Sequence, residues 1–182
     1  TTIYIALDAF DCVYHDFAVY GYTGTYVQDY ANEKGFRFVP IGGSEYDTMY
    51  EYEYYNDGIR INRYYGVETY LEIPEQIDGQ NVVAIGDYAF AHNNAITEVV
   101  IPVTVTSIGV GAFRDCYNLE CVNSDEMDNS NVEIISDYAF YGCESLCRVQ
   151  ILNSVINIGN NAFGECHSLE DINFPNSIRS IG

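Results

Sequence analysis

The sequence predicts a β-rich α/β solenoid built from coils of 23 residues. The main observation is a repeated string, which occurs as IGDYAF (85–90), IGVGAF (108–113), ISDYAF (135–140) and IGNNAF (158–163). The intervals between its first isoleucines, continued to Ile181, are 23, 27, 23 and 23 residues. Apolar columns keep the same step. A single unit of this length cannot bury its own apolar face, whereas stacked units share one continuous core.

Three apolar columns define the unit, which reads L-x-x-V-x-I-P-x-S-V-x-x-I-G-x-x-A-F-x-x-C-x-x. The columns are Ile96, Leu119, Leu146 and Leu169; Val99, Val122, Val149 and Ile172; and Val82, Val105, Val132, Val155 and Ile178. The alternation in V-x-I, with β-branched residues, favours a short strand. A following proline ends the strand because it cannot donate to a ladder. Glycine after the isoleucine permits a tight corner.

Two further columns are expected in the interior of each coil. The first fills the middle of the coil with an aromatic ring: Phe90, Phe113, Phe140 and Phe163. The second lies three residues later and is expected to satisfy the backbone of a corner: Asn93, Cys116, Cys143 and Cys166. There is no C-x-x-C motif and the thiols follow the repeat, so structural thiols are expected rather than a disulfide framework. Cys12, Cys121 and Cys147 lie off this column and are not placed by the pattern.

These motifs, in phase over residues 48–182, resemble the BspA-like (Treponema-type) leucine-rich repeat family. The resemblance implies a curved, right-handed solenoid with short strands on its concave side. Members are mostly surface or secreted proteins of bacteria, and several are implicated in adhesion to host matrix proteins or to other cells. The chain departs from the pattern at Ser136, which replaces a corner glycine, and in extra residues at 75–81 and 124–131.

The array is expected to occupy residues 71–182 as five units, the last one incomplete, behind an N-terminal hairpin cap at 47–70. In the cap, Tyr50, Tyr52 and Tyr54 alternate with glutamates, which predicts a strand with one apolar face. Asn56-Asp57-Gly58 predicts the turn of the hairpin. A solenoid requires such a cap because its first coil otherwise exposes core.

Residues 1–46 are interpreted as the terminal coil and the C-terminal-type cap of a preceding array. TGTYVQDYANEKGF (23–36) predicts a short helix that buries Val27, Tyr30 and Ala31 and stops at Gly35. FRFVPI (36–41) then predicts a strand, and the whole segment resembles the one that closes many BspA-like arrays. TTIYI (1–5) fits positions two to six of the repeat.

In the repeat, the opening leucine of a unit comes ten residues after the preceding corner glycine, as Leu169 does after Gly159. The sequence ends at the corner Gly182 and begins one residue after the position of an opening leucine. About ten residues would therefore join the end of one copy to the start of another in phase. Two interpretations follow. In the favoured one, the sequence is a window on a longer protein of tandem modules. In the other, separate chains stack head to tail, a contact that makes filaments if it does not close.

Composition excludes several classes of partner. The formal net charge is −20, with 27 acidic and seven basic residues. Such a surface repels phosphate backbones and anionic lipid, so we expect neither nucleic-acid binding nor membrane docking. No apolar run is long enough to insert into a membrane.

No enzymatic site is expected, and no cofactor or metal. Of His15, His92 and His167, only His167 adjoins a cysteine, and it is expected at the surface, pointing away from Cys166. The acidic stretch Asp125–Asp128 lacks the glycine and the terminal glutamate of an EF-hand loop, which favours a solvated loop.

The remaining candidate site is the concave strand face. Its outward positions do not repeat with the period, as expected of a recognition surface. A neutral solvated face would show a similar pattern. The candidates are Tyr70, Glu72, Glu98, Val100, Asn123, Arg148, Gln150, Asp171 and Asn173, with Cys121 also pointing outward. We therefore expect a bacterial surface or secreted adhesion module that recognises a protein or a glycan. The alternative is a structural module of an extended fibre or surface layer, whose partners are neighbouring copies of itself.

Overall fold

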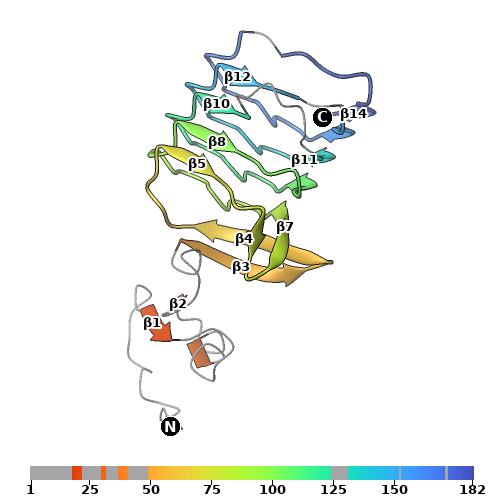
Figure 1. Ribbon diagram of the computed structural model, residues 1–182. Coiled ribbons are helices and arrows are strands. Elements are labelled where there is room, and N and C mark those ends of the chain that lie inside the picture. Colours follow the sequence, from red (N-terminus) through yellow and green to blue (C-terminus); the bar gives the residue numbers. More distant parts are fainter. Residues whose placement is uncertain are drawn as a thin grey trace, which may run out of the picture. The chain divides into compact units, whose positions relative to one another are not determined.

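The computed structural model describes residues 18–21, 30–31, 37–40, 49–123, 131–151, 153–170 and 172–182. The chain divides into two units, Thr1–Thr48 and Met49–Gly182. The strands of unit 2 form a β-solenoid, which confirms the predicted fold class (Figure 1). The second unit contains the repeats and is the part that positions the candidate site.

Unit 1 contains a parallel pair of strands, β1 (Ala18–Gly21) and β2 (Arg37–Pro40), in which Val19 lies opposite Phe38. Tyr30 and Ala31 are helical and buried, with 2% and 0% of their surface exposed. Strand β2 and these two residues lie where a strand and a helix are expected. The rest of that helix, the TTIYI segment and His15 and Cys12 lie outside the described residues, so the assignment of this unit as the end of a preceding array stays a prediction.

Unit 2 begins with an antiparallel hairpin of β3 (Tyr50–Tyr55) and β4 (Gly58–Tyr64). Its turn includes Asn56 in the left-handed conformation, with φ of 51°. The expected apolar face is only partly buried, since Tyr50 is 3% exposed whereas Tyr54 is 78% exposed. The pairing register shifts between Glu51 and Tyr52, which breaks the alternation along β3. The role of the hairpin as a cap stays a prediction.

Two sheets run along opposite sides of unit 2 (Figure 1). The first has four parallel strands, ordered β12-β10-β8-β5: β5 (Tyr70–Glu72), β8 (Glu98–Val100), β10 (Cys121–Val122) and β12 (Arg148–Val149). The second is ordered β14-β13-β11-β9-β7-β4-β3 and adds β7 (Gln80–Ile85), β9 (Ser107–Ile108), β11 (Ile134–Ile135), β13 (Asn157–Ile158) and β14 (Ser180–Ile181). Corresponding positions of successive repeats pair in both sheets, as Val99 does with Val122.

The two insertions lie at different places on the solenoid. In the first unit, β6 (Gln76–Ile77) pairs antiparallel with the start of β7, around the turn at Asp78-Gly79. The second insertion begins after Asn123, and residues 124–130, with the acidic stretch, lie outside the described part of the chain.

Stacked aromatic rings run through the core from coil to coil. Phe90, Phe113 and Phe140 are at most 1% exposed, and their ring centroids lie 4.8 and 5.1 Å apart in parallel stacks. Phe163 continues the stack at 5.4 Å from Phe140. At the other end, Tyr64 of the hairpin lies 5.2 Å from Phe90. The hairpin is thereby joined to the aromatic core as well as to the sheet.

Tyr64 is the polar member of this stack, and its hydroxyl donates a hydrogen bond to Glu68. Burial raises the pKa of Tyr64, and the hydrogen bond to Glu68 raises it further. The same bond lowers the pKa of Glu68. The tyrosine can therefore end the stack because its polar tip has a partner.

A second column links each coil to the carbonyl groups of the coil before it. The thiols of Cys116, Cys143 and Cys166 donate to the carbonyl oxygens of Phe90, Phe113 and Phe140 at 3.1, 3.1 and 3.2 Å. In the first coil, Asn93 Nδ2 donates to Gly66 at 3.1 Å, and its Oδ1 accepts from two following amides. Hydrogen bonding with Cys116, and then burial, raise the pKa of Cys143. Burial raises the pKa of Cys166 to about 11. The thiols of Cys143 and Cys166 therefore stay protonated at neutral pH.

Candidate ligand-binding face

The outward side of the four-stranded sheet carries side chains of different chemistry on adjacent strands. We call this surface the strand face and define it by the outward positions of β5, β8, β10 and β12 and of the residues that follow β10 and β12. Strand pairing aligns Tyr70, Glu98, Cys121 and Arg148 in a first row. The second row pairs Glu72 with Val100 and continues with Asn123 and Gln150, which follow β10 and β12 at the equivalent positions.

The inward row of the same strands is uniformly apolar. Leu71, Val99 and Val122 pair in register and are 3%, 0% and 5% exposed. Val149 continues the row beside Val122 and is half-buried. Since packing fixes this row, the chemical differences on the outward row are not required by the core of the solenoid.

Tyr70 and Glu72 form the end of the strand face on β5. Tyr70 is 48% exposed, and its hydroxyl donates a hydrogen bond to Glu72 Oε1 at 2.9 Å. Glu98 lies next to Tyr70 on β8 and is half-buried. The bond holds the phenol ring along β5, where it offers a flat apolar surface beside carboxylates. Tyrosine and arginine are the residues that most often anchor interfaces.

Cys121 is expected to point outward, and the structure shows that it is only 4% exposed. Glu98 and Arg148 flank it in register on the two neighbouring strands, and a small side chain between two long ones is covered. Burial raises the pKa of Cys121, while the Arg148 guanidinium acts in the opposite direction. Interaction with Cys121 and hydrogen bonding with Cys147 raise the pKa of Arg148, which is exposed.

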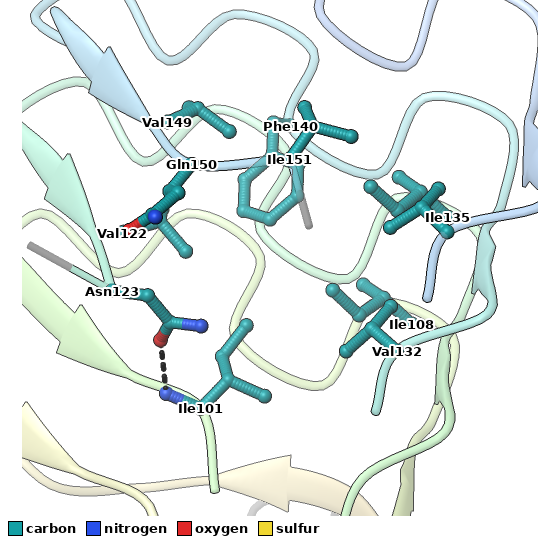
Figure 2. Close-up of a pocket in the computed structure, with 11 residues that line it drawn as sticks. Ile101, Ile108, Val122, Asn123, Val132, Ile135, Phe140, Val149, Gln150 and Ile151 are labelled. Atoms are coloured by element: carbon teal, nitrogen blue, oxygen red, sulfur yellow. Dashed lines mark hydrogen bonds between the residues drawn. The ribbon is translucent and has the colours of Figure 1, made fainter. Parts of the chain in front are cut away.

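The side chain of Asn123 serves the fold. Its Oδ1 accepts a hydrogen bond from the Ile101 amide at 2.7 Å, as Figure 2 shows. One coil earlier, the equivalent amide of Ile73 donates to a backbone oxygen, that of Val100, at 3.0 Å. Asn123 has φ of 49°, a left-handed conformation that asparagine tolerates. At the start of the insertion, the amide side chain therefore takes the place of a backbone carbonyl.

Replacing Asn123 by alanine is expected to lower the free energy of unfolding by about 1–2 kcal/mol, because Ile101 is 5% exposed and its amide would lose its acceptor. Asn123→Asp keeps an acceptor oxygen and tolerates the left-handed backbone, so it is the matched control. Urea unfolding followed by circular dichroism compares the two. Equal stability of the alanine and aspartate variants would show that the hydrogen bond contributes nothing.

The other two candidates lie beyond β12. Asn173 is exposed, and within the described ranges no strand follows β12 in this sheet. Asp171 lies outside the described residues. The described strand face therefore consists of the rows on β5, β8, β10 and β12, with Asn123 turned toward β8.

A small cavity lies behind the face, between the two sheets. Its volume is about 20 Å³, and Figure 2 shows its lining, in which Phe140 lies among aliphatic side chains and Asn123 and Gln150 are the polar members. This volume holds about one water molecule. This cavity is therefore too small to enclose a ligand.

The described residues contain neither a candidate metal site nor a helix that could span a membrane. Among them, no group of three or more His, Cys, Asp or Glu side chains is placed to hold a metal ion. His167 is exposed and lies 3.3 Å from Glu165. None of the helical residues in the described ranges belongs to a segment with the length and apolar character that crossing a bilayer requires.

Two tyrosine rings and an arginine form a cluster on another side of the coils, and the sequence pattern did not predict it. The Arg114 guanidinium lies 5.2 and 5.8 Å from the ring centroids of Tyr141 and Tyr138, which meet edge to face. Arg114 Nε also lies 3.3 Å from Asp115. The spacing of the two tyrosines around the Ala-Phe motif is visible in the sequence, but their contact with the preceding coil depends on the stacking.

Comparisons with known proteins agree with this architecture. The BspA type leucine rich repeat region matches residues 69–182 in six copies. No curated protein matches the chain. Among solved structures, the T. pallidum leucine-rich repeat protein is 34% identical, with a TM-score of 0.68 over 74% of this chain and 62% of that one.

Two other solved structures are similar. A leucine-rich repeat protein from Bacteroides ovatus is 27% identical, with a TM-score of 0.61 over 74% of this chain and 36% of that one. A leucine rich cell surface protein from Faecalibacterium prausnitzii is 28% identical, with a TM-score of 0.53 over 71% of this chain and 42% of that one. The chain thus spans less than two thirds of the length of these three proteins. From the repeat match and the similarity to the T. pallidum protein, the chain belongs to the BspA-type leucine-rich repeat family.

Proposed function

We propose that the chain is a bacterial surface or secreted adhesion module that recognises a protein or a glycan through the strand face. Leucine-rich repeat proteins are in general non-enzymatic protein-interaction modules, which supports the broad class. The description of the F. prausnitzii relative as a cell surface protein supports the location.

The observation that carries the proposal is the contrast between the two sides of one sheet. The inward row repeats apolar residues from coil to coil, whereas the outward row changes from tyrosine to glutamate, cysteine and arginine. Solenoids use such extended surfaces for binding. Arg148 is the one arginine on β5, β8, β10 and β12, so it offers a charged donor to a carboxylate or sulfate of the partner, on a face whose acids Glu72 and Glu98 lie on β5 and β8.

The test compares two variants that each remove one acid and one arginine, so net charge is unchanged. Glu98→Ala/Arg148→Ala alters the strand face, and Glu133→Ala/Arg179→Ala removes exposed charges elsewhere on unit 2. Each protein is applied to immobilised fibronectin, laminin, collagen and fibrinogen and to a glycan array. On any surface that retains the wild-type chain, we expect the first variant to bind roughly tenfold more weakly or worse, as loss of anchor residues costs about 1.4 kcal/mol or more.

Other outcomes reject the proposal. Equal binding by both variants would place the site elsewhere, and no binding of the wild-type chain to any surface would remove the support for adhesion. Electron microscopy of the isolated chain addresses the alternative, a structural module that assembles head to tail. Filaments that disperse on dilution, together with no binding to the panel, would favour that alternative.

A further inference from the structure

Two free thiols lie at the starts of β10 and β12, at the edge of the strand face. Cys121 of β10 lies opposite Arg148 of β12, and Cys147 directly precedes Arg148. The amides of Cys147 and Arg148 both donate to the Glu120 carbonyl, at 3.0 and 3.3 Å. The Cys147 sulfur lies 3.5 Å from the same oxygen. The backbone therefore holds Cys147 beside the residue that precedes Cys121.

This placement brings the two cysteines within range of a covalent bond. Adjacent strands lie about 4.8 Å apart and rise about 3.3 Å per residue, so neighbours offset by one residue have Cα atoms about 6 Å apart. Disulfides span Cα separations of about 4.4–6.8 Å. The Arg148 guanidinium interacts with both sulfurs. The column thiols differ, because Cys116 and Cys143 are fully buried whereas Cys147 is exposed.

We propose that Cys121 and Cys147 form a reversible disulfide across the first residues of β10 and β12. Both cysteines are free thiols in the structure. Cys147 is exposed and Cys121 is buried, so an oxidant in solution meets Cys147 first. The inference does not depend on the proposed adhesion function. Oxidation would remove two thiol partners of Arg148, and would therefore change the surroundings of the arginine on the strand face.

The reaction with glutathione disulfide balances in two exchanges. The Cys147 thiol loses its proton, and its thiolate attacks one sulfur of glutathione disulfide. The glutathione S–S bond breaks, a mixed disulfide forms on Cys147, and one reduced glutathione leaves. The Cys121 thiolate then attacks the Cys147 sulfur and releases the second reduced glutathione. Two protein thiols are oxidised, one glutathione disulfide is reduced, and the two protons end on the two glutathione molecules.

Peptide mapping of the folded chain tests the proposal. The reduced protein is freed of reductant, incubated with glutathione disulfide, quenched with N-ethylmaleimide and cleaved after glutamate. This cleavage separates the cysteines of unit 2 onto different peptides: 99–120, 121–126, 134–144, 145–165 and 166–170. We expect 121–126 to be linked to 145–165, and dithiothreitol to release the two peptides. Linkage of any other pair in place of this one would overturn the proposal.

A single substitution isolates the second exchange. In Cys121→Ser, glutathione should remain on Cys147 at a level roughly tenfold higher than in the wild-type chain, because the neighbouring thiol that resolves the adduct is absent. Cys166→Ser is the matched control and should behave as the wild-type chain does. Equal adduct in the wild-type chain and Cys121→Ser, with the 121–126 peptide alkylated, would contradict the inference. If Cys121→Ser does not fold, as thermal melting would show, the peptide map of the wild-type chain still decides it.

Discussion

Replacing Phe113 by alanine is expected to lower the free energy of unfolding by about 3–5 kcal/mol, the usual cost of deleting a buried ring. Phe113 is 0% exposed, and its ring is stacked between Phe90 at 4.8 Å and Phe140 at 5.1 Å. The substitution removes contacts with two neighbouring coils at once and leaves a cavity in the middle of the stack. Guanidinium unfolding followed by circular dichroism measures the loss.

Phe163→Ala is the matched control for this prediction. Phe163 is half-buried and stacks on Phe140 alone among the rings of the column, at 5.4 Å. Its loss should therefore cost clearly less than the loss of Phe113. If the two variants have the same stability, or if Phe113→Ala melts as the wild-type chain does, the proposed register of the core is wrong.

Replacing Gly159 by alanine is expected to lower the free energy of unfolding by about 2–3 kcal/mol, within the range for overpacking. Gly159 follows β13 at a corner of its coil. A Cβ atom there would lie 2.4 Å from the Asp137 backbone nitrogen and 2.6 Å from the Ser136 carbonyl carbon. Both atoms belong to the backbone of the preceding coil, so neither can move without disturbing the stack.

The chain itself provides the control, because Ser136 holds the same corner position one repeat earlier. That site already accommodates a Cβ atom, so Ser136→Ala should change the free energy of unfolding by less than about 1 kcal/mol. Thermal melting of the two variants compares alanine at equivalent corners. A Gly159→Ala variant as stable as Ser136→Ala would show that the coils separate easily at this corner.

The periodicity of the sequence was sufficient to predict the solenoid, because the period decides which positions face the core. Ile85 and Ile108 pair in one sheet and Val99 and Val122 in the other, as the repeated columns require. The turn at Asp78-Gly79 also follows from local residue preference. The turn depends on the conformational preferences of neighbouring residues, and the strand pairing depends on the length of the repeat. Both properties can be read directly from the sequence.

Other features depend on contacts that the periodicity does not specify. Asn123 belongs to the outward row by alternation, yet its side chain accepts the hydrogen bond of the Ile101 amide, where one coil earlier a backbone carbonyl is the acceptor. Cys121 is buried because its two neighbours on adjacent strands are long. Tyr64 extends the phenylalanine stack from outside the repeat, which only the packing of the hairpin reveals. The role of the strand face in ligand binding stays a prediction.

A comparison of two exposed tyrosines tests the central claim that the strand face binds the ligand. Tyr70 lies on the strand face and is 48% exposed, whereas Tyr54 lies on the hairpin and is 78% exposed. Dissociation constants are measured by biolayer interferometry for the wild-type chain, Tyr70→Ala and Tyr54→Ala. The immobilised ligand is the matrix protein or glycan that retains the wild-type chain in the binding panel. We predict that Tyr70→Ala binds roughly tenfold more weakly or worse and that Tyr54→Ala binds as the wild-type chain does. Unchanged binding by Tyr70→Ala, with loss in Tyr54→Ala, would contradict the claim and move the site to the hairpin.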